Sequence, residues 1–165
     1  VRPVVMGSDR KCELEANLML FFTGFTRFSS DVQKASGASD KAARLKEMLA
    51  LVNEAEAVLT DTARPLSEFG RLLDVTWKLK RGTSSGVSTG SIDELYARGV
   101  EAGAVGGKLL GAGGGGFLVF YVEPDAQASV REALSDLLYI PFEFEGDGAS
   151  VVYFDPEDYD TEGGR

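Results

Sequence analysis

Residues 103–120 read GAVGGKLLGAGGGGFLVF, and the interpretation of the whole chain depends on this stretch. Eight of the chain's 20 glycines fall in its first fourteen residues, 103–116. A helical pattern precedes the stretch, and the apolar run Phe117–Val122, typical of a buried strand, follows it. The glycine excess is therefore local, and it indicates a shaped turn or a binding site rather than general disorder.

Two common explanations for such glycines do not fit. A flexible linker is rich in Gly and Ser and lies between polar segments, whereas this stretch lacks Ser and has apolar flanks. A Walker A phosphate loop has the form G-x-x-x-x-G-K-[ST]. When Gly107 and Lys108 are placed at its G-K step, Ala102 stands at its first glycine. Leu109 then stands where Ser or Thr is required, so the motif fails at both ends.

A third motif fits by spacing alone. Gly111, Gly113 and Gly116 match the G-x-G-x-x-G of dinucleotide-binding folds. That fingerprint follows a strand and opens a helix, whereas here the helical pattern comes before and the strand after. What remains is a tight turn in which two backbone segments approach closely, with or without a bound phosphate.

Composition limits the classes of function. The chain carries 26 acidic and 17 basic residues, a net charge of −9, which disfavours a nucleic-acid partner because such proteins neutralise phosphates with Lys and Arg. It has no histidine and a single cysteine, Cys12. Zinc clusters, His-based triads and an internal disulfide are therefore excluded, and a reducing, cytoplasmic location is expected. No apolar run approaches the ~20 residues of a membrane span, so no membrane partner is expected.

Hydrophobic periodicity predicts a mixed succession of elements. Strands are expected over residues 4–6, 18–23, 117–122, 139–145 and 150–154, the last two joined by a hairpin turn at 146–148. Helices are expected over residues 9–17, 39–60, 65–82, 91–102 and 126–137, with a short one after residue 29 or 30. Ser8 is the expected N-cap of the first helix, and Ser91 opens a capping box. Such an order predicts an α+β fold with helices packed on a largely antiparallel sheet.

The strongest helical signal lies at residues 39–60. Its apolar residues recur at steps of three and four and are expected to face inward: Ala42, Leu45, Leu49, Val52, Ala55 and Leu59. Trp77, on the next helix, is expected in the core or at a domain interface. No linker or repeat divides the chain, so residues 1–155 are expected to form one domain and the acidic residues 156–165 a frayed tail.

The segment Gly106–Phe117, GGKLLGAGGGGF, resembles the third motif of the GHMP kinases, a superfamily that includes galactokinase, homoserine kinase and mevalonate kinase. Further segments are similar to the sugar branch, above all to the D-glycero-D-manno-heptose phosphate kinases: residues 13–27 (ELEANLMLFFTGFTR), 70–80 (GRLLDVTWKLK), 141–145 (PFEFE) and 151–154 (VVYF). The resemblance covers nearly the whole chain and corresponds to the C-terminal domain of such a kinase.

This resemblance implies a ferredoxin-like domain with a four-stranded, largely antiparallel sheet, and ATP with Mg²⁺ as cofactors. It implies nucleotide contacts from Gly106, Gly107, Lys108, Gly111, Ala112, Gly113, Gly114, Gly115 and Gly116. It also places Thr23 and Arg27 near a small-molecule sugar substrate, where Arg27 could grip a phosphate with its two-pronged guanidinium. No catalytic residue and no metal ligand is implied within this chain.

GHMP kinases have two domains, and their main ATP-binding loop, P-x-x-x-G-L-G-S-S, lies in the N-terminal one. No such loop occurs here, and the first residue is Val rather than Met. We therefore expect a C-terminal domain whose partner is its own N-terminal domain, absent from this chain. The N-terminal domain would hold most of the ATP and Mg²⁺ site, so the chain alone is expected to be inactive.

Several alternatives stay open. The chain could belong to another GHMP branch, acting on fucose or in the mevalonate pathway. It could also be a non-catalytic ferredoxin-like module for regulation or dimerisation, and an exposed interdomain surface could pair it into a homodimer. Lys108 could be a solvated surface lysine, and Arg27 could form an ordinary surface ion pair.

Overall fold

The computed structural model describes residues 3–25, 38–82, 87–111 and 115–145, with residues 38–41 described by their backbone alone. The elements follow the order α1 (Ser8–Asn17), β1 (Leu18–Phe22), α2 (Ala38–Thr60), α3 (Ser67–Arg81), α4 (Gly90–Glu101), β2 (Gly106–Leu110), β3 (Phe117–Tyr121), α5 (Gln127–Ala133) and β4 (Leu138–Ile140). The described strands form one antiparallel sheet in the order β2-β3-β1-β4. This strand–helix–strand–strand–helix–strand arrangement confirms the expected α+β, ferredoxin-like fold.

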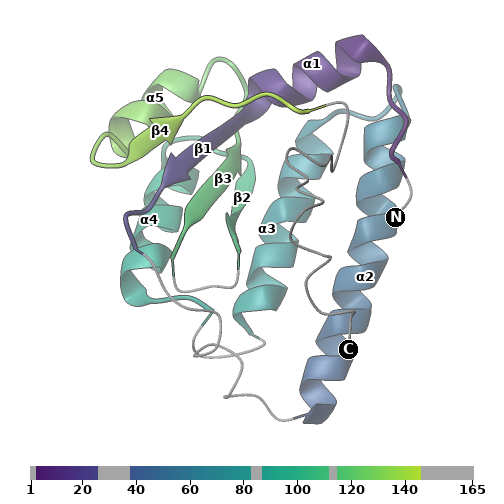
Figure 1. Ribbon diagram of the computed structural model, residues 1–165, viewed down its shortest axis with the longest axis horizontal. Helices are drawn as coiled ribbons and strands as arrows, with labels where there is room; N and C mark the ends of the chain where they lie inside the picture. Colours follow the sequence, from purple (N-terminus) through teal and green to yellow (C-terminus); the bar gives the residue numbers. More distant parts are fainter. Residues whose placement is uncertain (1–2, 26–37, 83–86, 112–114, 146–165) are drawn as a thin grey trace, which may run out of the picture.

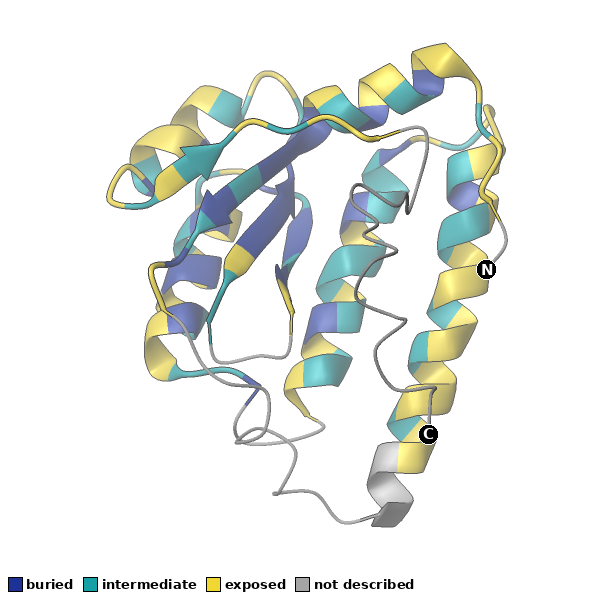
Figure 2. Cartoon of the chain, viewed as in Figure 1, coloured by how far each residue is buried: buried dark blue, intermediate teal, exposed yellow. Residues whose placement is uncertain are grey.

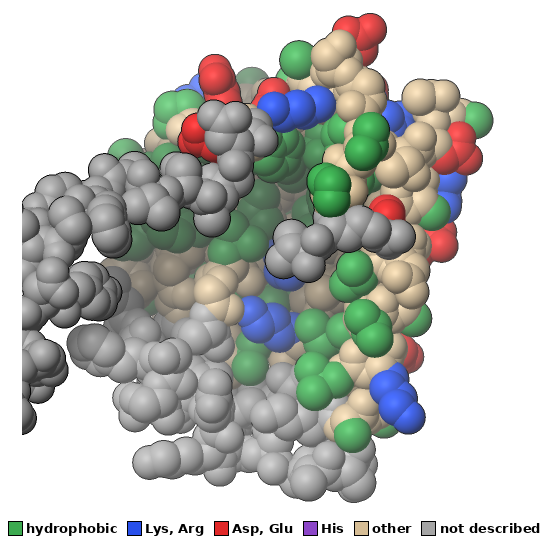
Figure 3. Space-filling view, turned by 45° about the vertical axis from the view of Figure 1, so that its right-hand side comes forward, with side chains coloured by type: hydrophobic (Ala, Val, Ile, Leu, Met, Phe, Trp, Pro, Cys, Tyr) green, Lys and Arg blue, Asp and Glu red, His purple; other side chains and the backbone are tan. Residues whose placement is uncertain are grey.

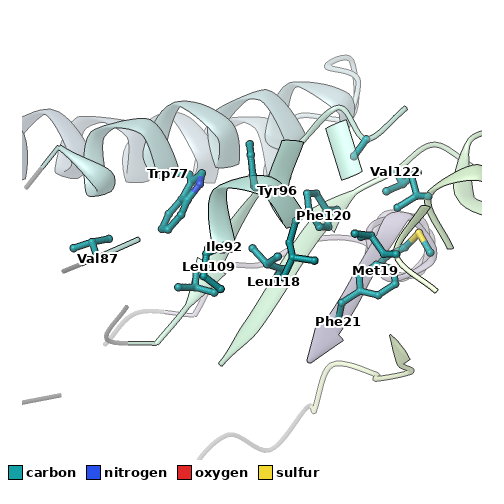
Figure 4. Packing of buried hydrophobic residues seen from close by; sticks show 14 residues of the cluster. Met19, Phe21, Trp77, Val87, Ile92, Tyr96, Leu109, Leu118, Phe120 and Val122 are labelled. Atoms are coloured by element: carbon teal, nitrogen blue, oxygen red, sulfur yellow. The ribbon is translucent and has the colours of Figure 1, made fainter. Parts of the chain in front are cut away.

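The sheet has two differently covered faces (Figure 1). Helices α4 and α5 cover one face, α3 lies alongside β2, and α2 lies beyond α3, farthest from the sheet. Between the sheet and α4 and α5 lies the main core, which includes Phe21, Phe120, Leu109 and Ile92 (Figure 4). Trp77 of α3 is also buried in this core. Of the two locations expected for it, the core and a domain interface, it occupies the core.

The opposite face, here called the groove face, follows from the strand register, because residues paired across antiparallel strands point to the same side. Lys108 of β2 pairs with Val119 of β3, which pairs with Leu20 of β1. A second apolar cluster covers part of this face with residues from α1, α2 and α3. Strands β1, β2 and β3 are largely buried, whereas the edge strand β4 is intermediate to exposed, as Figure 2 shows.

Within the described residues, one predicted strand is absent, one strand was not predicted, and one predicted strand was too long. Residues 4–6 form no strand, and Val4 and Val5 are exposed. Strand β2 lies inside the glycine stretch, where no strand was expected. Of residues 139–145, only the beginning pairs with β1, as β4. The predictions for the short helix after residue 29 or 30, the turn at 146–148 and the strand at 150–154 lie outside the described residues.

The helix caps also differ from the expected ones. Helix α4 begins at Gly90, and its cap is Thr89, whose side-chain oxygen accepts a hydrogen bond from the backbone N–H of Ile92 at 3.3 Å. Ser91 therefore lies inside the helix and makes no capping box. Helix α1 begins at Ser8, one residue earlier than predicted, and Gly7 is its cap without a side-chain bond. In both cases a residue upstream of the expected serine already has the extended backbone of an N-cap.

Helix α2 confirms the predicted helix but not its predicted burial. Leu45, Leu49 and Val52 are 51%, 64% and 59% exposed, and the helix is coloured mostly as exposed in Figure 2. Near its end, Val58 is fully buried. Because α2 packs on α3 rather than on the sheet, the three exposed residues line an open groove between the two helices and stay largely exposed.

The C-terminal end of α2 is fixed by one buried arginine of α1. Arg10 donates through Nε to the carbonyl of Leu59 at 2.9 Å and through Nη2 to those of Val58 and Arg64 at 2.5 and 2.8 Å. Two of these carbonyls belong to the last turn of α2, where the helix dipole is negative and carbonyls lack helical partners. Arg10 therefore ties α1 to α2 and to the turn that follows it. No helix in the described ranges is long and apolar enough to cross a bilayer.

Candidate functional site: the glycine hairpin and its two lysines

The glycine stretch is a β-hairpin in which β2 leads into a loop over residues 111–116 and then into β3. The loop is flanked by Gly111 and Gly116, whose φ angles are +91° and +108°. These positive values favour glycine, because a side chain would strain the backbone there. Ala112, Gly113 and Gly114, which were predicted nucleotide contacts, lie outside the described residues. The tight turn deduced from the sequence is thus a hairpin loop, here called the glycine loop.

Gly106 and Gly107 lie in β2 and are buried, so packing explains their lack of a side chain. A Cβ on Gly106 would collide with the backbone carbonyl of Gly70, where α3 lies against β2. A Cβ on Gly107 would come within 2.5 Å of the carbonyl of Val119 and 2.6 Å of the Phe120 ring. These two glycines let a helix and a ring approach the sheet closely. Their predicted contact with a nucleotide stays a prediction.

The second end of the glycine loop is tied to the end of β1. The backbone N–H and the hydroxyl of Thr23 both donate to the carbonyl of Gly116, at 2.9 and 2.8 Å, and Gly116 N–H donates to the carbonyl of Phe25 at 2.9 Å. Thr23 is 5% exposed. Gly115 lies so close to Phe25 that a Cβ would collide with its carbonyl. The structure therefore brings Thr23 to the glycine loop as a support of its shape, while Arg27 lies outside the described residues.

The first end of the glycine loop is tied to α3. Lys80, in the last turn of that helix, donates from Nζ to the carbonyl of Gly111 at 2.7 Å. The pKa of Lys80 is lowered by burial and, less strongly, by the nearby positive charge of Lys108. No site role was expected for Lys80 from the sequence. A usable signal was present, since helix residues 78, 80 and 81 are all basic just before the loop that precedes α4.

Lys108 projects from the middle of β2 on the groove face. It is half-buried, and burial lowers the pKa of its ammonium group below the usual value. Its strand neighbour on this face is the buried Val119. The alternative of a solvated surface lysine does not describe this position, because the side chain lies among apolar groups.

Two apolar grooves meet at Lys108. The larger, here called the sheet groove, measures about 700 Å³ and lies on the groove face, where Leu20, Phe69 and Phe142 line it. Among its described lining residues, only Lys11 and Lys108 have polar side chains. The smaller, here called the helix groove, measures about 460 Å³ and runs between α2 and α3, again with Lys108 in its wall. Figure 3 shows hydrophobic side chains gathered around this hollow, with basic ones among them.

The arrangement suits the binding of an anion more than acid–base chemistry. The ammonium group of Lys80 contacts the glycine loop at Gly111, and Lys108 carries a second positive charge whose effect reaches Lys80. Within the described ranges, no group of three or more His, Cys, Asp or Glu side chains could hold a metal ion.

Comparison with known proteins agrees with this geometry. The chain is 32% identical over 138 residues to the D-glycero-alpha-D-manno-heptose 7-phosphate kinase of Campylobacter jejuni, a match covering 81% of this chain and 40% of that protein. It is 31% identical over 118 residues to the L-fucokinase/L-fucose-1-P guanylyltransferase of Bacteroides fragilis, covering 68% of this chain and 12% of that protein. The chain therefore spans less than half the length of these relatives.

Solved structures share the fold. A mevalonate kinase from Methanococcus jannaschii superposes with a TM-score of 0.65 at 21% identity, over 82% of this chain and 42% of that one. A D-glycero-D-manno-heptose 1-phosphate kinase from Bacteroides thetaiotaomicron superposes with a TM-score of 0.53 at 25% identity, over 87% and 38%. Residues 48–140, more than half of the chain, match the family model for the C-terminal domain of GHMP kinases. The chain therefore belongs to the GHMP kinase family, as its C-terminal domain.

Proposed function

We propose that this chain is the C-terminal half of an ATP-dependent kinase that phosphorylates a hydroxyl group of a sugar or sugar phosphate, with a heptose phosphate as the first candidate. The observation that carries the proposal is the glycine loop, which is anchored at one end by Thr23 and at the other by Lys80. Phosphoryl transfer depends mainly on positioning the phosphates and stabilising their charge. A loop with both ends fixed to the fold supplies such positioning, and Lys108 supplies charge.

The nucleotide is proposed to lie against the glycine loop, Gly111 to Gly116, where backbone N–H groups can donate to phosphate oxygens. Thr23 and Arg27 are proposed to lie near the sugar, with Thr23 acting through the loop that it supports. ATP supplies the transferred phosphoryl group. Mg²⁺ is proposed to be held mainly by an N-terminal half, together with the larger part of the ATP site.

Two features support an adjoining N-terminal half as the partner. The apolar stripe of α2 remains largely exposed at Leu45, Leu49 and Val52, which line the open helix groove. The sheet groove opens beside the glycine loop and is almost wholly apolar. Large exposed apolar patches mark interaction surfaces, and the chain spans only 40% of the heptose 7-phosphate kinase that it resembles. A cytoplasmic location is proposed with this function, because sugar phosphates and ATP occur there.

The test is phosphoryl transfer, measured as ADP release with ATP and Mg²⁺. It compares the 165-residue chain with a longer protein that joins it to a GHMP N-terminal half, against heptose 7-phosphate, fucose and mevalonate. We expect turnover by the longer protein with heptose 7-phosphate and none by the chain alone. Turnover by the chain alone would contradict the division of labour. Absence of transfer to all three substrates by the longer protein would favour the non-catalytic module, and preference for fucose or mevalonate would favour another branch.

A further inference from the structure

The chain that follows β4 borders the sheet groove but pairs with none of the described strands. Residues 141–145, here called the strap, run alongside α1 (Figure 1). The strap is attached at Phe144, whose backbone N–H donates to the carboxylate of Glu15 at 2.7 Å. The carbonyl of the same residue accepts a hydrogen bond from Nζ of Lys11 at 3.0 Å. Both backbone groups of Phe144 therefore point toward α1.

The strap has the geometry of a strand with one free edge. Phe142 and Phe144 both line the sheet groove, and their rings pack edge to face with 5.8 Å between centroids. In an extended chain, side chains two residues apart share a face, and the N–H and C=O of one residue point to the same edge. The backbone groups of Glu143 and Glu145 then point away from α1. They have no backbone hydrogen bond within the described ranges, so this edge can receive a further strand.

The sheet groove lacks an apolar cover and a counter-charge. Apart from two lysines, its described lining residues are apolar, so covering them with apolar side chains would be favourable. Lys108 in its wall is half-buried, and no carboxylate of the described residues lies within ion-pair distance of it. A buried cation without a partner is unfavourable. A segment that suits this groove is therefore apolar and has acidic residues close by.

The last residues of the chain have that composition. Residues 146–165 lie outside the described residues, and their sequence is GDGASVVYFDPEDYDTEGGR. The turn sequence at 146–148 leads into the apolar run 151–154, and five acidic residues follow at 155–162. Because the strap already lines the sheet groove, a turn at its end is enough to bring the apolar run back to that groove.

We propose that residues 149–154, here called the cover strand, return along the free edge of the strap and cover the sheet groove, while the acidic residues beyond them supply a counter-charge for Lys108. The occupant of the groove is thus a segment of this chain itself. This inference goes beyond the proposed function and is tested without substrate, so either can fail alone. An N-terminal half would then meet the outer side of the cover strand, and the apolar stripe of α2 stays available to it.

The turn sequence determines how the cover strand pairs. A three-residue hairpin loop favours glycine at its last position, where the backbone is left-handed, and Gly148 holds that position here. Glu143 then lies opposite Val151, and the two exchange backbone hydrogen bonds through the free edge. Because side chains alternate along a strand, Val152 faces the sheet groove beside Phe142, whereas Val151 faces outward.

The first test is NMR spectroscopy of the 165-residue chain. Paired residues that share no hydrogen bond have Cα atoms only about 4.5 Å apart. We therefore expect contacts between the α protons of Phe144 and Ser150, and between those of Phe142 and Val152. The amide of Val151 should exchange slowly, because it bonds to the strap. Absence of both α-proton contacts would overturn the pairing and leave the groove to another occupant, such as an N-terminal half.

Two adjacent valines on opposite sides of the cover strand provide a matched pair of variants. Val152→Asp places a charge against the apolar groove and should lower the Tm by about 5–10 °C. Val151→Asp makes the same change on the outward side and should lower the Tm by about 3 °C or less. If Val152→Asp abolishes the cooperative transition, Val152→Thr and Val151→Thr form a milder pair with the same expected order. Equal effects within a pair would overturn the cover.

The counter-charge is tested by changing the acidic residues at 155–162 to their amides (D155N, E157Q, D158N, D160N and E162Q). Loss of these negative charges should lower the pKa of Lys108, measured by NMR titration of its ammonium group. Lys78 is the matched control, because it pairs with Asp74 at 2.6 Å and its pKa should stay the same. An unchanged pKa of Lys108, or an equal change at both lysines, would show that the acidic residues do not lie at the groove.

Discussion

Gly107 lies where β2, β3 and the Phe120 ring meet, and its missing side chain is a packing requirement. Gly99 of α4 approaches the same ring, and a Cβ there would lie 2.6 Å from it. Phe120 is fully buried between the two glycines and packs on Tyr96 at 5.6 Å between ring centroids. The space occupied by the Phe120 ring thus helps to explain why two different elements carry glycine where they contact it.

From this packing we predict that Gly107→Ala destabilises the domain by about 2–3 kcal/mol, a cost typical of overpacking. The new methyl group would press on the backbone of β3, which cannot move without breaking its strand pairing. Gly90→Ala is the control, because nothing lies within 4 Å of a Cβ there. Urea unfolding should show the first effect and little change for the second. An equally small effect of both substitutions would contradict the packing role of Gly107.

Two buried tyrosines make the stability of the fold depend on pH in the alkaline range. Burial, aided by the charge of Glu123, raises the pKa of Tyr121 to about 12, and burial together with a 2.8 Å hydrogen bond to Asp74 raises the pKa of Tyr96. The unfolded chain releases these protons near pH 10, whereas the folded chain keeps them. The unfolded state therefore binds fewer protons in this window, and stability falls as pH rises.

We predict that the urea concentration at the midpoint of unfolding falls progressively from about pH 10 to pH 12. The lowered pKa values of Lys80 and Lys108 act in the opposite direction, but their effect is complete once unfolded lysines have titrated near pH 10.5. Tyr121→Phe should make the decline less steep, although it removes the hydrogen bond from Asn17 at 2.9 Å and lowers stability overall. A decline that is as steep in the variant would show that Tyr121 does not cause it.

At the scale of elements, α2 depends on a single side chain of α1. We predict that Arg10→Met destabilises the domain by about 2–3 kcal/mol, because three carbonyls, two of them in the last turn of α2, would lose a charged donor. Arg71→Met, on the exposed side of α3, is the control and should change stability by less than about 0.5 kcal/mol. Hydrogen exchange should show the C-terminal turns of α2 opening first in the Arg10 variant. Uniform exchange along α2 would argue against a local anchor.

The elements also show what the sequence could and could not predict. Periodicity identified the helices and the strands at 18–22 and 117–121, since their apolar patterns are long or continuous. Strand β2 was missed because Gly106 and Gly107 have low strand propensity, which pairing with β3 and contact with α3 override. The candidate site shows the same difference between local patterns, which the sequence reveals, and contacts between distant segments, which it does not. The glycine loop and Lys108 were predicted from a local motif, whereas Lys80 and the support from Phe25 depend on contacts between distant segments.

At the scale of the whole molecule, the apolar stripe of α2 has the properties of an interface. We predict that the chain alone self-associates at high micromolar concentration, because association would bury this exposed apolar stripe. This result would agree with the homodimer considered in the sequence analysis. Leu49→Lys, at a position 64% exposed, should restore a monomer without loss of Tm. Sedimentation analysis of both proteins is the test. A monomeric parent chain at that concentration would show that the stripe does not mediate pairing.

The strand order has a consequence for how the chain folds. Leu18 pairs with Tyr121 and Leu20 with Ile140, so β1 joins both of its neighbours across more than a hundred residues. Such pairings close large loops and are slow to form. The pairing of β2 with β3 spans only the glycine loop, which makes it the natural early event. The hairpin that carries the glycine loop would then also begin the assembly of the sheet.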